Sequence, residues 1–147
     1  MRFAHTNIIA RDWRTLADFY IRNFGCEVVP PERDYTGQDL DRGTGLTGAQ
    51  LSGVHLRLPG HGPDGPTLEI YSYADPVVPE SKAVNQLGYG HVAFEVENVH
   101  TLRTHLLTDG CGPVGEVVTL RTADGRNVTW CYVTDPEGNA VELQSWS

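Results

Sequence analysis

Two histidines and two glutamates occur at matched places in the two halves of the sequence. His5 and His91 each open a short stretch of alternating residues, and Glu69 and Glu142 each lie within a later apolar stretch. Neutral imidazoles and carboxylates suit a divalent transition metal such as Zn, Ni, Co, Mn or Fe, and two acids would balance its charge. Such a set leaves one or two positions for water or substrate, as a Lewis-acid site requires. The alternative is two ordinary strand histidines and two solvated glutamates, and the matched spacing favours the metal.

An internal repeat relates the two histidines, which lie 86 residues apart. His5 precedes Asp12 by seven residues, and His91 precedes Asn98 by the same number. Asp and Asn are residue types that cap helix N-termini. Each cap is followed by an apolar stripe at helical spacing that ends at a glycine: Trp13, Leu16, Ala17, Tyr20 and Phe24 before Gly25, and Val99, Leu102 and Leu106 before Gly110. This repeat predicts two β-α-β units of one design.

Strand alternation turns the four candidate side chains away from the core. In the stretch 92–96 the valines and Phe94 share one face, which leaves His91 on the other. Glu69 and Glu142 are each flanked by apolar residues of opposite parity, so their carboxylates point away from the core face. Further strands are expected at 54–58, 67–71, 126–133 and 140–144. Each half is therefore predicted to form a βαβββ module.

The first half is longer than the second, and the extra length lies in residues 34–53. This segment is rich in Gly, Thr and Asp and has no strong period, so we expect a long loop that acts as a lid or binding loop. Just before it, Pro30-Pro31 is expected to end the strand that starts at Cys26. We expect one domain over 1–147, made of a first module at 1–74, a linker at 75–87 with Pro76 and Pro79, and a second module at 88–147.

Composition excludes several classes of protein. The net charge is −8 and no cluster of Lys and Arg stands out, which argues against a nucleic-acid partner. The N-terminus lacks a long apolar run, so neither a signal peptide nor a membrane anchor is expected. The three cysteines are an odd count without CxxC spacing, and Cys26 and Cys111, each after a glycine, are expected to be small buried side chains. A cytoplasmic location is the simplest expectation.

The motifs resemble the vicinal oxygen chelate superfamily, which includes glyoxalase I, methylmalonyl-CoA epimerase, extradiol dioxygenases, and fosfomycin- and bleomycin-resistance proteins. The resemblance rests on His5 in HTNIIARD, the run DWRTLADFY that starts at Asp12, Glu69 in LEIY, His91 in GHVAFEVEN and Glu142 in YVTDPEGNAVEL. It covers both halves apart from 34–53 and the linker. It implies an α+β fold in which tandem βαβββ modules form an open, half-barrel mixed sheet with helices outside.

The order of the ligands separates the members of this superfamily. His5, Glu69, His91 and Glu142 resemble the His, Glu, His, Glu metal ligands of glyoxalase I-like proteins. Epimerases usually carry Gln at the second position, and dioxygenases and fosfomycin transferases usually carry His there, so Glu69 argues against both. The nearby histidines that might substitute, His55 and His61, are interpreted as surface residues.

The resemblance implies a divalent-metal-dependent lyase or isomerase of the glyoxalase type. Such an enzyme removes a proton next to a carbonyl while the metal stabilises the enediolate, and the catalytic base would be Glu142 or Glu69. Glu142 is favoured because the second half keeps the more regular framework. The alternatives are a non-catalytic drug- or metabolite-binding protein of the bleomycin-resistance type and, more weakly, a ring-cleaving dioxygenase. We expect a small-molecule substrate and a homodimer, and the modules could pair within one chain or between two.

Overall fold

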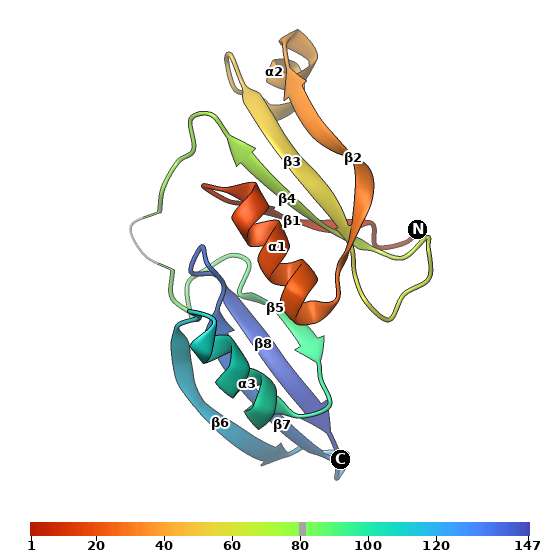
Figure 1. Cartoon of the computed structure of the whole chain (residues 1–147), viewed down its shortest axis with the longest axis vertical. Helices are drawn as coiled ribbons and strands as arrows, with labels where there is room; N and C mark the ends of the chain where they lie inside the picture. The colour runs from red at the N-terminus through yellow and green to blue at the C-terminus, as the bar shows by residue number, and fades with distance from the viewer. Residues whose placement is uncertain (80–81) are drawn as a thin grey trace. The chain divides into compact units, whose positions relative to one another are not determined.

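The chain forms two compact units, Met1–Val78 and Pro79–Ser147. The computed structural model describes residues 1–79 and 82–147. Each unit contains a four-stranded sheet with a long helix packed against it (Figure 1). The division between the units falls inside the segment expected to be a linker. No helix in the described ranges is long and apolar enough to span a membrane.

Both units follow the βαβββ order that the sequence predicts, and the first adds a short helix between its second and third strands. The first contains β1 (His5–Ile9), α1 (Trp13–Phe24), β2 (Glu27–Thr36), α2 (Gln38–Thr44), β3 (Gln50–Arg57) and β4 (Thr67–Tyr73). The second contains β5 (His91–Glu95), α3 (Val99–Thr108), β6 (Pro113–Arg121), β7 (Asn127–Thr134) and β8 (Ala140–Trp146). The sheet orders are β1-β4-β3-β2 and β5-β8-β7-β6, and in each sheet only the first-named pair is parallel. The α+β fold of two mixed sheets is confirmed, and neither sheet closes into a barrel.

The predicted N-terminal caps of both helices are present, whereas α3 ends at Thr108 with Asp109, one residue before the predicted Gly110, as its C-cap. The Asp12 carboxylate accepts hydrogen bonds from the amides of Arg14 and Thr15, and Gly25 ends α1 in the left-handed region at φ 66°. In the second unit the Asn98 side chain accepts from the amide of Thr101 at 2.9 Å. These caps satisfy backbone groups that a helix leaves without an internal partner, and they fix where each helix begins.

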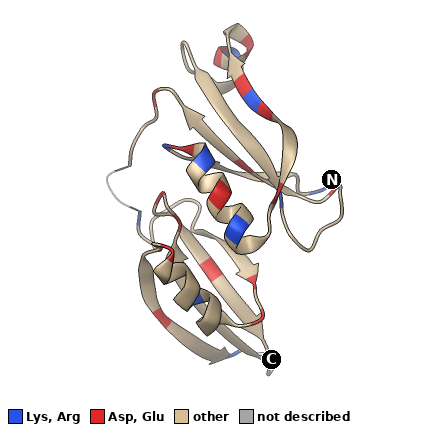
Figure 2. Ribbon diagram, viewed as in Figure 1, with Lys and Arg blue, Asp and Glu red and all other residues tan. Residues whose placement is uncertain are grey.

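The core lies between each helix and one face of its sheet. The predicted stripe of α1 is buried throughout, and it packs on the β3 and β4 residues that alternate away from Glu69, including Leu56, Leu68 and Ile70. The second unit has the same arrangement, with Leu106 of α3 over Val141 and Leu143, all fully buried. The opposite face of each sheet carries the polar side chains. In Figure 2, strand β8 is uncharged along its length except for one acidic band.

Two expectations about the first unit are wrong. Strand β2 does not end at Pro30-Pro31, a cis pair; it continues to Thr36, with a shift of register against β3 between Val29 and Arg33. Proline is tolerated here because β2 is an edge strand and does not need every amide for pairing. Segment 34–53 is also not one long loop, because its ends pair as β2 and β3 and its middle forms α2.

The sequence pattern did not predict helix α2, because this helix has no buried residue and therefore no apolar period. The turn after it is held by a side chain rather than by packing. The Asp41 carboxylate accepts hydrogen bonds from the amides of Gly48 at 2.9 Å and Ala49 at 2.8 Å. This segment is an ordered extension of the sheet.

Candidate functional site

In the first unit, β1 and β4 bring His5 and Glu69 together. The strands are parallel, and Asn7 is the register partner of Glu69. His5 lies two residues before Asn7 on the same face, so its ring reaches the carboxylate. His5 Nδ1 is 3.3 Å from Glu69 Oε1, and the carboxylate side chain is 13 % exposed while the imidazole is 49 % exposed. The pair lies on the sheet face opposite α1.

The second unit repeats this geometry with β5 and β8. Ala93 is the register partner of Glu142, and His91 again lies two residues earlier. His91 Nε2 is 3.2 Å from Glu142 Oε2, with the side chains 36 % and 16 % exposed. The structure therefore brings each predicted histidine to the predicted glutamate of its own unit.

His55 belongs to the first of these clusters, and its interpretation as a surface residue is wrong. It is the register partner of Glu69 across β3 and β4, and its Nε2 lies 3.3 Å from Glu69 Oε1. The same nitrogen is 2.7 Å from the hydroxyl of Tyr71, and the ring is only 23 % exposed. The signal for this placement was strand parity, because His55 alternates with Val54 and Leu56, which face the core.

The environment of this cluster changes its acid–base properties. Burial lowers the pKa of His55, and the charges of Arg33 and His5 lower it further, while Glu69 acts in the opposite direction. Burial also raises the pKa of Tyr71 to about 12, with the charge of Glu69 as the next cause. At neutral pH the Tyr71 phenol therefore keeps its proton, and His55 is biased towards the neutral imidazole.

An aromatic pair takes the place of the second histidine in the other unit. Tyr132 is the register partner of Glu142, as His55 is of Glu69. Burial, then the charge of Glu142 and its hydrogen bond, raise the pKa of Tyr132. The Tyr132 ring lies 5.1 Å from the ring centroids of both His91 and Trp130. The face of the first sheet thus carries more ionisable groups, and the second offers ring surfaces.

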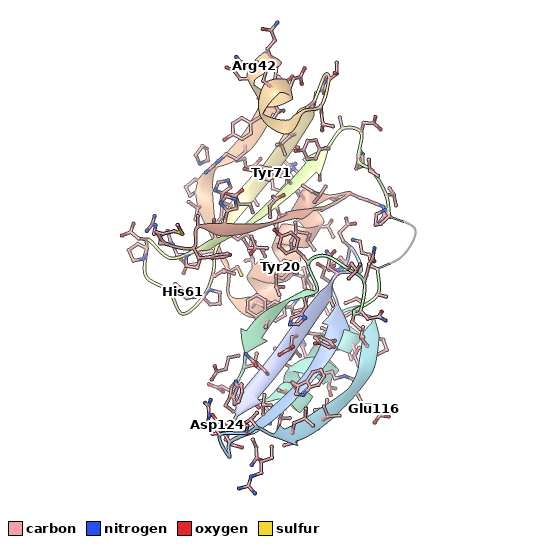
Figure 3. The ribbon with its side chains drawn as sticks, turned by 180° about the vertical axis from the view of Figure 1, so that it is seen from behind. Tyr20, Arg42, His61, Tyr71, Glu116 and Asp124 are labelled. Atoms are coloured by element: carbon pink, nitrogen blue, oxygen red, sulfur yellow. The ribbon has the colours of Figure 1, made fainter. Side chains whose placement is uncertain are left out.

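The remaining histidines lie away from both clusters. His61 is exposed in the loop between β3 and β4, and Figure 3 shows it on that loop, well away from Tyr71. His100 and His105 are exposed on α3. Tyr89, between the last strand of the first unit and the first strand of the second, is fully exposed. These residues contribute nothing to the two His–Glu pairs.

The donor atoms of the two pairs suit a divalent metal. Each pair presents an imidazole nitrogen and a carboxylate oxygen on the polar face of a sheet. Divalent transition-metal ions bind both kinds of donor atom. Over residues 1–79 and 82–147, no group of three or more His, Cys, Asp or Glu side chains is arranged to hold a metal ion. Each pair taken alone supplies one nitrogen and one oxygen donor.

The chain is similar to several solved structures over nearly its full length. A glyoxalase family protein from Bacillus cereus is 22 % identical, with a TM-score of 0.83, covering 99 % of this chain and 94 % of that one. A glyoxylase/bleomycin resistance protein/dioxygenase domain from Frankia sp. is 17 % identical, with a TM-score of 0.67 and coverage of 100 % and 98 %. FosX from Listeria monocytogenes, a fosfomycin resistance protein complexed with Mn(II) and sulfate, is 14 % identical, with a TM-score of 0.57 and coverage of 98 % and 91 %.

These structural similarities show the fold, and the sequence match shows the family. None of the curated proteins matches the sequence. The match of a family model to residues 2–143 spans both His–Glu pairs and all eight strands apart from the end of β8. This chain belongs to the glyoxalase/bleomycin resistance protein/dioxygenase superfamily.

Proposed function

We propose that this protein is a divalent-metal-dependent lyase or isomerase of the glyoxalase type, with His5, Glu69, His91 and Glu142 as metal ligands. The observation that supports this most is the repetition of one His–Glu pair, with separations of 3.3 Å and 3.2 Å, at equivalent register positions of two modules. A repeat that conserves only a fold has no need to keep both an imidazole and a carboxylate on the polar face. When bound, the ion would supply Lewis-acid stabilisation of the negative charge that develops on the substrate oxygens.

The chain's own contribution is a carboxylate that moves a proton next to a carbonyl. Glu69 Oε1 is contacted by both His5 and His55, which leaves that oxygen little freedom to accept a substrate proton. Glu142 contacts one imidazole, that of His91, and accepts a hydrogen bond from the Tyr132 hydroxyl. We therefore propose Glu142 as the base and Glu69 as the more permanent ligand.

Two measurements test this proposal. Protein purified without chelator should contain about one divalent ion for each set of four ligands by elemental analysis. In D₂O it should also exchange protons next to the carbonyl of small α-hydroxyketones, followed by ¹H NMR, and EDTA should stop the exchange. Glu142→Gln should lose exchange while it keeps metal, and Glu69→Gln should lose metal as well. The exposed Glu116 of β6 gives the control, since Glu116→Gln should change neither.

The contrary outcomes are distinct. Equal loss of metal in Glu69→Gln and Glu142→Gln would refute the division of roles between them. Less than about a tenth of an equivalent of metal would refute the enzyme and favour a binding protein. The rings of Trp130 and Tyr132, 5.1 Å apart beside His91, are the observation that supports that alternative, because they offer stacking surface to a planar ligand.

A further inference from the structure

Tyr71 holds the His55 ring through a hydrogen bond between neighbouring strands. The Tyr71 hydroxyl lies 2.7 Å from His55 Nε2, and the two rings meet edge to face with their centroids 5.9 Å apart. The Tyr71 ring lies over its register partner Gly53, where a Cβ would be only 2.4 Å from Tyr71 Cδ1. The His55 ring is therefore fixed by the pairing of β3 with β4 and by the lack of a side chain at Gly53.

The same nitrogen of His55 faces Glu69. His55 Nε2 is 3.3 Å from Glu69 Oε1. Because a carboxylate can only accept hydrogen bonds, this contact is favourable when Nε2 carries a proton, which the Tyr71 oxygen also accepts. With its ring 23 % exposed, His55 thus uses Nε2 on two protein oxygens. His5 contacts the same carboxylate oxygen through Nδ1 and is 49 % exposed, so an ion in solution can reach it.

The second unit carries different residues at the positions of this support. Tyr132 stands opposite Glu142, where His55 stands opposite Glu69. The next register pair on the same face is Trp130 with Gln144, in place of Gly53 with Tyr71. The Trp130 indole therefore occupies the place that a glycine leaves open in the first unit. Since the βαβββ module folds with either set, the fold itself does not require the His55–Tyr71 bond.

We propose that His55 is a positioning residue for Glu69, and that Tyr71 holds His55 in place for this purpose. Strand β4 lies between β1 and β3, so His5 and His55 contact Glu69 Oε1 from the two neighbouring strands. Hydrogen bonds to a ligating carboxylate orient it and raise metal affinity. The benefit to metal binding rests on the proposed function. The positioning of Glu69 does not, and it can be tested in metal-free protein.

Crystal structures of the full chain grown in EDTA test the positioning. In the unsubstituted protein Glu69 should have one conformer, with Oε1 beside His5. His55→Leu keeps an apolar side chain of similar length but removes the N–H, so Glu69 should adopt more than one conformer. His61→Leu is the matched control, because His61 is exposed in the loop between β3 and β4, and it should leave Glu69 unchanged. A single, unchanged Glu69 conformer in His55→Leu would overturn the proposal. If that variant does not fold, Tyr71→Phe replaces it under the same criterion.

Titration with Co²⁺, followed by its visible absorption, separates positioning from direct coordination by His55. His55→Leu should weaken Co²⁺ binding about 10–100-fold. Tyr71→Phe should weaken it about fivefold, the equivalent of one net hydrogen bond. His55→Gln should restore most of the affinity lost in His55→Leu, because its amide can still donate to Glu69.

The contrary results identify which idea fails. Equal losses in His55→Gln and His55→Leu, or tighter binding by Tyr71→Phe, would make His55 a ligand and overturn the positioning role. Unchanged Co²⁺ affinity in His55→Leu would overturn it as well. If the unsubstituted protein binds no Co²⁺, the proposed function is refuted, and the conformers of Glu69 in the metal-free crystals alone decide the positioning role.

Discussion

Gly53→Ala is the substitution whose consequence follows most directly from the structure. A Cβ at position 53 would lie 2.1 Å from the Ile70 carbonyl oxygen and 2.8 Å from Tyr71 Cα, where ordinary contact begins at 3.4 Å. The first of these contacts is too short by about 1.3 Å. Both are backbone atoms of β4, so no side-chain rotation relieves them, and β3 must move away from β4.

The expected cost combines strain and a lost hydrogen bond. Forcing one extra carbon into a packed site costs about 1–3 kcal/mol. Moving the Tyr71 ring also breaks its 2.7 Å hydrogen bond with His55, which contributes about 1 kcal/mol. We therefore expect Gly53→Ala to destabilise the first unit by about 2–4 kcal/mol.

Urea unfolding followed by the NMR signals of each unit is the appropriate assay. Gly62 and Gly43 give the controls, because a Cβ at either position meets nothing within 4 Å and neither needs a positive φ. Gly62→Ala should be close to neutral, and Gly43→Ala in α2 should stabilise by up to about 1 kcal/mol. If Gly53→Ala unfolds within about 0.5 kcal/mol of the original protein, the close contact between β3 and β4 inferred here is wrong.

Three further outcomes are expected. Burial lowers the pKa of His55, so below about pH 6.5 the unfolded chain gains a proton before the folded one. The free energy of unfolding should therefore decrease as the pH is lowered through this range. His55→Gln should flatten this dependence in urea titrations at several pH values, and an unchanged slope would contradict it. Burial raises the thiol pKa of Cys26 and Cys111 to about 11. At about pH 8 both thiols should therefore react with a thiol reagent far more slowly in the folded chain than in urea. Equal rates in the two conditions would disprove their burial. Asp12→Ala removes the cap of α1 and should cost about 1 kcal/mol in thermal or urea unfolding, whereas Asp12→Asn, which can still cap, should cost less.

The parts of the fold that were predictable from the sequence are those set by local rules. The caps at Asp12 and Asn98 depend on a side chain and amides two or three residues away. The buried stripe of α1 depends on helical spacing within twelve residues. Alternation likewise placed Glu69 and Glu142 opposite the buried Leu68 and Leu143. Such features need no knowledge of which strands pair.

The parts that were not predictable depend on which strands pair and in what register. To predict that β2 continues beyond Pro31, one must know that β2 is an edge strand, and this is a property of the whole sheet. From the sequence His55 was interpreted as a surface residue, yet the β3–β4 pairing makes it the direct neighbour of Glu69. Arg33 carries no signal in the sequence at all, because only the register shift in β2 brings it opposite Gly53.

By itself the sequence determined that a histidine and a glutamate recur on the polar face of each of two βαβββ modules. Periodicity and parity suffice for that, because they are properties of a single strand or helix. Only the tertiary structure decided what surrounds each pair: His55, Tyr71 and Arg33 around the first, and Tyr132 and Trp130 around the second. Those neighbours come from different strands, and contacts between strands are fixed by hairpin length, bulges and register, which no local pattern encodes.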